Sequence, residues 1–228
     1  LLAYILLGMM FGTDGILKIP FDNFTIAEQI CTVSLIFIMF YGGFGTNWKQ
    51  AKPVAGKAVL LSTVGVILTA VTTGAFCHFI LKMDFWESML IGSVISSTDA
   101  ASVFSILRSR RLNLKNNTAS MLEVESGSND PMAYMLTIVL IQFLQSSGMG
   151  AGAILGSFAV QFLVGAAAGY GLGKLAILIL NKINVDNQAL YPILLLSFVF
   201  FTFAITDRLH GNGYLAVYIA GIMVGNNK

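Results

Sequence analysis

The sequence predicts an all-α membrane protein, a bundle of transmembrane helices, and two observations support this fold class. Of the 228 residues, 56% are hydrophobic and 11% are charged, whereas about 25% of the residues in an average soluble domain are charged. The apolar residues also gather in long runs with short breaks between them, as in chains that cross a bilayer several times. The lipid bilayer is therefore the expected surroundings. A net charge of +2 gives no sign of a nucleic-acid partner.

Eight apolar segments are expected, and they cover residues 1–12, 25–46, 54–81, 86–108, 118–145, 151–181, 189–207 and 213–226. Turn-forming residues such as Thr13-Asp14-Gly15 separate them. Most of the segments can span a hydrocarbon core of about 30 Å, since a helix rises about 1.5 Å per residue. The first segment is shorter and the chain begins without methionine. We therefore expect the chain to be a fragment.

Lysine and arginine are distributed unevenly between the two predicted faces of the membrane. When alternate segment ends are assigned to alternate sides, one side collects ten of these residues and the other collects three. By the positive-inside rule, the connections after the second, fourth and sixth segments face the cytoplasm.

The fourth segment carries a carboxylate near the predicted midplane of the bilayer. It reaches Asp99 thirteen residues after Trp86, or about 20 Å along a helix. Asp99 lies in the run Ser96-Ser97-Thr98-Asp99-Ala100-Ala101-Ser102, which has four hydroxyl side chains and one carboxylate. Such side chains compete for backbone groups, so we expect a discontinuous helix here, with freed carbonyl oxygens lining a polar cavity. Hard cations prefer this set of oxygen ligands.

The fifth segment carries a second carboxylate at a similar depth. It reaches Asp130 twelve residues after Thr118, or about 18 Å from the cytoplasmic end. Ser126, Asn129 and Asp130 have the spacing i, i+3 and i+4 and share one helical face. Glu125 points away from this face, and we expect it to contact another helix. A charge at membrane depth costs about 3 kcal/mol on insertion scales, so both aspartates indicate a functional site.

Three motifs resemble the monovalent cation:proton antiporters of the electroneutral type, and within them the potassium/proton, cell-volume-regulation branch. The motifs are Ser97-Thr98-Asp99-Ala100-Ala101, Glu125-Ser126-Gly127-Ser128-Asn129-Asp130-Pro131 and Gly213-Tyr214-Leu215-Ala216-Val217-Tyr218-Ile219-Ala220-Gly221. The resemblance extends over the whole chain. It implies exchange of a monovalent cation for H⁺ by alternating access, without covalent chemistry, so the protein is not expected to be an enzyme or to need a cofactor. It also implies a homodimer in a bacterial inner membrane, with roles in cell-volume regulation and pH homeostasis.

The resemblance assigns roles to five residues. Asp130 is the carboxylate for which a proton and a cation compete, and Asn129 marks one-for-one exchange. Ser126, and Thr98 through its backbone oxygen, are further ligands of the transported cation. Asp99 is the carboxylate of the broken helix. Sodium-selective archaeal relatives place a glutamate near Tyr41-Gly42-Gly43, where this chain has Tyr41. This difference favours potassium and leaves sodium open.

The family fold implies a moving core that is built from inverted repeats. It also implies a static scaffold that forms the dimer. Residues 54–145 are expected to form the core with its broken helix, and residues 1–53 and 146–228 the scaffold and dimerisation helices, with the second repeat absent. Gly165, Gly169 and Gly173 make two GxxxG steps, which suit either packing within the chain or a dimer contact.

The alternative function is that of an intramembrane aspartyl protease, because such enzymes also have two aspartates near the midplane of the membrane on neighbouring helices. Asp99 and Asp130 would then act as the catalytic pair. The flanking residues argue against it, since Asn129 and Thr98 stand where such proteases have glycine and tyrosine.

Overall fold

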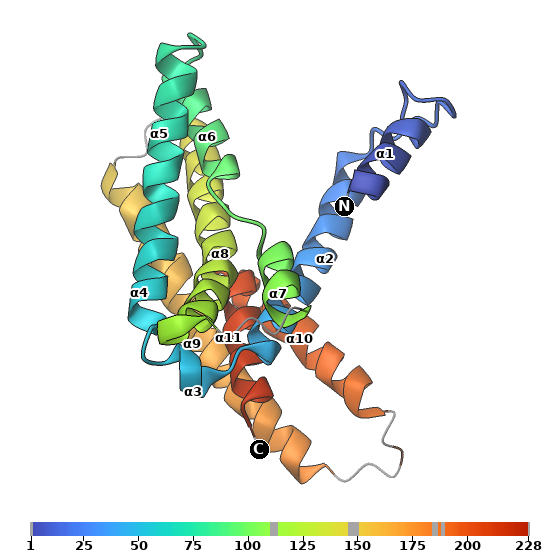
Figure 1. The fold of residues 1–228 in the computed structure, drawn as a ribbon, viewed down its shortest axis with the longest axis vertical. Helices are drawn as coiled ribbons and strands as arrows, with labels where there is room; N and C mark the ends of the chain where they lie inside the picture. The colour runs from blue at the N-terminus through green and yellow to red at the C-terminus, as the bar shows by residue number, and fades with distance from the viewer. Residues whose placement is uncertain (1, 110–113, 146–150, 184–186, 188–189, 228) are drawn as a thin grey trace. The chain divides into compact units, whose positions relative to one another are not determined.

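The computed structural model describes residues 2–109, 114–145, 151–183, 187 and 190–227, and every regular element in these ranges is helical (Figure 1). The elements are α1 (Leu2–Phe11), α2 (Phe24–Gly45), α3 (Trp48–Ala51), α4 (Ala55–Leu60), η1 (Leu61–Gly65), α5 (Val66–Phe79), α6 (Phe85–Ile95), α7 (Ala100–Ser109), η2 (Lys115–Asn117), α8 (Thr118–Gln145), α9 (Ala151–Lys182), α10 (Leu190–Arg208) and α11 (Gly213–Gly225). The predicted all-α fold class is confirmed.

Each predicted apolar segment coincides with one helix or with consecutive helices, and the ends differ by at most two residues. The third segment is not a uniform α-helix, because a π-helical turn, η1, joins α4 to α5. The short helix α3 and the 3₁₀ turn η2 were not predicted. The predicted orientation also rests on Arg110, Arg111 and Lys228, which lie outside the described residues.

Five stretches of the described chain are long and apolar enough to cross a membrane: α2, α4 to α5, α6 to α7, α9 and α10. Helix α8 has 28 residues but includes Glu123, Glu125 and Asp130, so it is more polar than these five. Helices α1 and α11 are apolar but shorter. The protein is thus a multi-pass membrane protein in which one long helix carries three of the six acidic side chains found within the described helices.

The chain divides into two compact units, Leu1–Leu35 and Ile36–Lys228. In the first, the turn after α1 is closed by backbone hydrogen bonds, in which Leu17 donates to the Met10 carbonyl at 3.1 Å. The Asn23 side chain then caps α2, because its Oδ1 accepts from the Ile26 backbone N–H at 3.1 Å.

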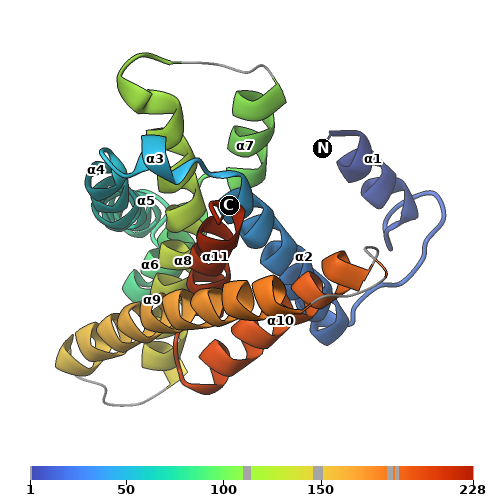
Figure 2. The same cartoon turned by 90° about the horizontal axis from the view of Figure 1, so that it is seen from below.

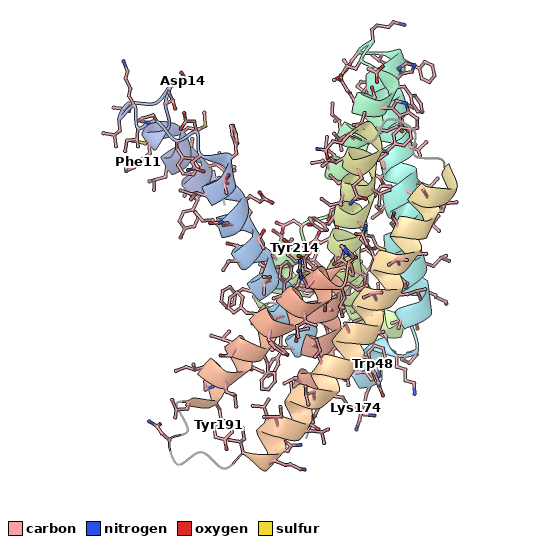
Figure 3. All side chains as sticks on the ribbon, turned by 180° about the vertical axis from the view of Figure 1, so that it is seen from behind. Phe11, Asp14, Trp48, Lys174, Tyr191 and Tyr214 are labelled. Atoms are coloured by element: carbon pink, nitrogen blue, oxygen red, sulfur yellow. The ribbon has the colours of Figure 1, made fainter. Side chains whose placement is uncertain are left out.

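Helix α11 is the centre of the second unit. Figure 2 shows it between α8 and the last turns of α2, with α9 and α10 crossing beside it. The side chains of Tyr214 to Tyr218 are all buried. Tyr214, which is labelled in Figure 3, packs edge-on against Tyr134 of α8, with ring centroids 4.9 Å apart. It also packs against Phe203 of α10 in a tilted arrangement, with centroids 5.0 Å apart. A helix that is apolar all round is expected to be buried. The first half of α11 meets that condition, whereas Ile219, Ile222 and Met223 are only partly buried.

Small residues let the neighbouring helices approach α11 closely. A Cβ atom on Gly169 of α9 would lie 2.6 Å from the carbonyl oxygen of Ala216, and one on Gly173 would lie 3.1 Å from the Cα atom of Ala220. A Cβ atom on Gly43 of α2 would lie 2.2 Å from the Tyr218 carbonyl oxygen. The glycine stripe of α9 therefore packs within the chain, which is one of the two roles expected from its GxxxG steps.

Candidate functional site

The predicted discontinuous helix is present. Helix α6 ends at Ile95 and α7 begins at Ala100, and residues 97–99 between them have no regular secondary structure. Ser96 closes α6, since its hydroxyl donates to the Ser93 carbonyl at 2.6 Å. Polar residues thus end one half-helix where an apolar sequence would have continued it.

Asp99 begins the second half-helix. Its carboxylate accepts from the Ser102 backbone N–H at 3.3 Å and from the Ser102 hydroxyl, and its carbonyl accepts from the Val103 N–H. This is the geometry of an N-cap, which also places a negative charge at the positive end of α7. The prediction that Asp99 shapes the broken helix agrees with these contacts. Its side chain is exposed in the described chain.

The polar face of α8 meets the break between α6 and α7. The Ser97 hydroxyl donates to Oδ1 of Asp130, and Nδ2 of Asn129 donates to the Thr98 hydroxyl. The Ser97 hydroxyl also lies 3.2 Å from the carbonyl oxygen of Thr98. Four residues from two helices far apart in sequence therefore form one polar cluster, which we call the Asn-Asp cluster: Ser97, Thr98, Asn129 and Asp130.

Burial differs across this cluster. Asn129 is 1% exposed, Asp130 is partly buried, and Thr98 is exposed in the described chain. A partly buried carboxylate with a hydroxyl and a backbone carbonyl close by offers oxygen ligands from one side and an open approach from the other. Asp99 and Glu125 are near enough to Asp130 to act on it electrostatically.

Glu125 does not contact another helix through its carboxylate in the way we expected. Its two oxygens accept from Nδ2 of Asn129 at 3.4 Å and from the Ser126 hydroxyl at 3.3 Å, both on α8 itself. The side chain bends back along its own helix because the buried Asn129 amide needs acceptors. Glu125 thus joins the cluster, and the spacing i, i+4 between Glu125 and Asn129 is the signal that could have identified it.

Ser126 is buried, with 1% exposure, and donates to Glu125. Its predicted role as a cation ligand stays a prediction, as does that of the Thr98 carbonyl. Within the described residues, no group of three or more His, Cys, Asp or Glu side chains is arranged to hold a metal ion. The oxygen atoms of Asp130, Ser97 and the Thr98 carbonyl are of the type that hard cations bind.

A separate cavity of about 540 Å³ lies against the opposite face of α8. The α8 residues that line it, Val124, Ser128 and Met132, are spaced at i, i+4 and i+8 and point away from Asn129 and Asp130. Side chains of α4, α9 and α11 complete a mostly apolar lining. This cavity holds none of the five predicted site residues, and it separates α8 from α9 and α11 over part of their length.

These features define a class: a multi-pass helical membrane protein in which a broken helix faces an Asn-Asp pair on a neighbouring helix. All 228 residues match the family described as "Sodium/hydrogen exchanger, transmembrane". The chain belongs to this family, as the resemblance of its motifs predicted.

Curated relatives match the full chain. It is 38% identical to the K(+)/H(+) antiporter NhaP of Alkalimonas amylolytica, over 100% of this chain and 40% of that protein. It is 36% identical to the K(+)/H(+) antiporter NhaP2 of Shewanella oneidensis, over 99% of this chain and 39% of that protein. The chain thus spans about two fifths of the length of the curated relatives it matches.

A solved structure shares the fold. The sodium proton antiporter MjNhaP1 from Methanocaldococcus jannaschii superposes with a TM-score of 0.74 at 24% identity, over 98% of this chain and 55% of that chain. The helical arrangement described above therefore matches the fold of about half of that protein.

Proposed function

We propose that this chain carries the exchange site of a secondary antiporter that trades a monovalent cation for H⁺ across a membrane. The observation that supports it best is the contact between Asp130 and Ser97, because it brings the carboxylate of α8 to the break between α6 and α7. Membership of the sodium/hydrogen exchanger family and relatives named as K(+)/H(+) antiporters support the same activity.

Exchange follows from competition for one carboxylate. Proton binding neutralises Asp130, and cation binding neutralises it by ligation with neighbouring oxygen atoms. Only the neutralised site crosses a low-dielectric barrier at low cost, so the empty, charged site stays on the side where it was emptied. Coupling of the two flows then needs no covalent step.

The Asn129 side chain has a positioning role in this scheme. It contacts Thr98 on the broken helix and Glu125 on α8, so it links the two elements that frame Asp130. An amide in this position adds no charge, which fits one-for-one exchange of two singly charged ions.

Potassium is the favoured cation. Five relatives at 35% identity or more are named for K⁺. The family resemblance also implies a glutamate near Tyr41-Gly42-Gly43 in sodium-selective archaeal relatives, and this chain has Tyr41 there. Sodium stays possible, since a relative at 27% identity from Methanocaldococcus jannaschii is named a probable Na(+)/H(+) antiporter.

The proposed division of labour assigns residues 54–145 to a moving core and residues 1–53 and 146–228 to a scaffold. In support, the Asn-Asp cluster lies wholly within 54–145, and α11 is packed against α9 and α10 by close contacts. A bacterial inner membrane fits the bacterial relatives. Homodimer formation, cell-volume regulation and pH homeostasis stay predictions from the family resemblance.

Proton flux in everted vesicles containing the full-length protein tests the proposal. Addition of K⁺, Na⁺ and Li⁺ in turn is expected to dissipate an imposed proton gradient, with K⁺ the most effective. If no cation alters the gradient in the wild-type protein, the proposal is wrong.

The protease alternative predicts peptide cleavage instead of cation-dependent proton flux. It requires cleavage of a helical peptide that is lost when Asp99 or Asp130 is replaced by asparagine. Family membership favours the antiporter, and peptide cleavage by the wild-type protein without cation-dependent proton flux would reverse that preference.

A further inference from the structure

Asn212, in the turn before α11, is a buried polar residue that the exchange mechanism above does not use. Its side chain is 2% exposed. A buried amide must satisfy its donors and acceptors, so its hydrogen bonds show which parts of the protein it joins.

The side chain of Asn212 joins α11 to α8. Its Oδ1 accepts from the Leu215 backbone N–H at 2.9 Å, which caps α11. Its Nδ2 donates to the carbonyl oxygen of Pro131 at 2.9 Å. Pro131 directly follows Asp130, so this bond fixes the backbone of α8 beside the carboxylate.

The backbone of Asn212 is held separately by α9. Its N–H donates to the Gln161 carbonyl at 2.9 Å. Gly165 allows this close approach, since a Cβ atom there would lie 2.8 Å from the Asn212 carbonyl oxygen. The residue is thus anchored to α9 by its main chain, and its side chain reaches across to α8.

Other contacts also join α8 and α11. Tyr218 lies over Gly127 and its hydroxyl donates to the Glu123 carbonyl at 3.4 Å, and Tyr214 packs on Tyr134. Beside these contacts, the apolar cavity of about 540 Å³ is lined by both helices. An interface that includes an open space can change its packing at lower cost than a filled one.

We propose that Asn212 is a positioning residue, a latch by which the scaffold holds α8 at the exchange site in one of the two access states. The inference rests on the proposed antiport and on the proposed division into core and scaffold. A core that moves relative to the scaffold displaces the Pro131 carbonyl from Nδ2, and a hydrogen bond does not survive a shift of more than about 1 Å. The bond therefore stabilises the conformation that contains it and sets the balance between the two states.

The test distinguishes two roles of the Asn212 side chain, the bond to α8 and the cap of α11. Serine is a good N-cap residue, so Asn212→Ser keeps the bond to the Leu215 N–H but is too short to donate to the Pro131 carbonyl. Apparent KM values for K⁺ and Na⁺ are measured with the full-length protein in everted and in right-side-out vesicles, and the amount of protein in the membrane is measured in parallel.

The apparent affinity on each side falls with the fraction of protein in the state open to that side. For each cation, loss of one hydrogen bond is therefore expected to raise the KM measured on one side of the membrane and lower the KM measured on the other, by up to roughly fivefold. The amount of Asn212→Ser protein is expected to stay at the wild-type level. A residue that only caps α11 would leave both KM values unchanged in the serine variant.

Asn226 provides a matched control at the other end of α11. Its Nδ2 donates to the Thr46 carbonyl at 2.8 Å and its Oδ1 accepts from the Trp48 N–H at 2.9 Å, so it joins α11 to the connection between α2 and α3. Both partners belong to the proposed scaffold. Asn226→Ser is therefore expected to leave both KM values unchanged.

Three outcomes would overturn the latch in a wild-type protein that exchanges cations: unchanged KM values in Asn212→Ser, changes of the same sign on both sides, or an equal effect of Asn226→Ser. A wild-type protein without cation-dependent flux would instead contradict the proposed function, and the latch with it. If the serine variant does not reach the membrane, Asn212→Thr replaces it, because threonine is also an N-cap residue and is too short to donate to the Pro131 carbonyl.

Discussion

Helices α8 and α11 lie side by side but are built on different principles. Helix α8 has three acidic residues and a proline, and its polar face is held by side-chain hydrogen bonds to the break between α6 and α7. Helix α11 has no charged residue, and its neighbours approach it over glycines. The polar contacts of α8 are few and specific, whereas the packing of α11 is extensive and steric. Substitutions on the polar face of α8 should therefore change exchange, and substitutions of the glycines packed against α11 should change the amount of folded protein.

The largest expected effect on the α8 side is that of Asp130→Asn. The amide cannot alternate between a proton and a cation, so cation-dependent proton flux in vesicles should be abolished while the protein reaches the membrane in normal amount. Asp14→Asn, in the turn after α1, is the control and should exchange normally. Residual exchange in Asp130→Asn would show that another carboxylate carries the ions.

The largest expected effect on the α11 side is that of Gly169→Leu. A side chain there meets the backbone of Ala216, with the Cβ atom already 2.6 Å from the carbonyl oxygen, so α9 and α11 must separate. Overpacking of this kind costs about 1–3 kcal/mol or more. The amount of folded protein, measured by detergent extraction and size-exclusion chromatography, should fall.

Gly171→Leu is the matched control for that packing prediction. Gly171 lies on the same helix, and a Cβ atom there would have no atom of another helix within 4 Å, so this variant should extract like wild type. If both leucine variants behave alike, α9 does not depend on close contact with α11.

A smaller effect is expected for Thr98→Val, which keeps the shape of the side chain and removes an acceptor from the Asn129 amide. An unsatisfied buried donor costs about 1–3 kcal/mol, and Asn129 keeps Glu125 as a second acceptor at 3.4 Å. Exchange at saturating cation should fall by roughly tenfold at most. Thr72→Val is the control, because the Thr72 hydroxyl donates within its own helix, and an equal loss in that variant would contradict the link between Asn129 and the broken helix.

Tyr41→Glu is expected to change the rate of exchange least of all. It should instead change the selectivity between Na⁺ and K⁺. Tyr41 is exposed, with 63% of its surface accessible, and a carboxylate there adds an anionic group near the position where the family resemblance implies a glutamate in sodium-selective archaeal relatives. The ratio of Na⁺-driven to K⁺-driven flux should rise. Tyr41→Gln, which is polar but uncharged, should leave the ratio near that of wild type, and a rise in both variants would argue against a role for the charge.

Some of the fold could be read from local sequence. The helix ends were predicted to within two residues, because the length of an apolar run and the position of turn-forming residues are local properties. The break before Asp99 was also predictable, since four hydroxyls and a carboxylate in seven residues disfavour a continuous helix.

The partners of the polar side chains could not be read in this way. Glu125 was expected to reach another helix, yet its carboxylate accepts from Asn129 and Ser126 on its own helix. The i, i+4 spacing to Asn129 allows this contact, but it does not select it over a contact with a neighbouring helix. The π-helical turn η1 in the third apolar segment had no sequence signal that distinguished it from an α-helix.

Sequence alone determined which residues are helical, where one helix breaks, and that Asn129 and Asp130 share a face with Ser126, because periodicity and hydropathy act along the chain. Tertiary structure alone decided that Ser97 meets Asp130, that the glycines of α9 pack on α11, and that Asn212 reaches the Pro131 carbonyl. These contacts join residues 33 and 81 positions apart in two of the three cases. They depend on how the helices pack and which rotamers that packing leaves open, and no local pattern contains that information.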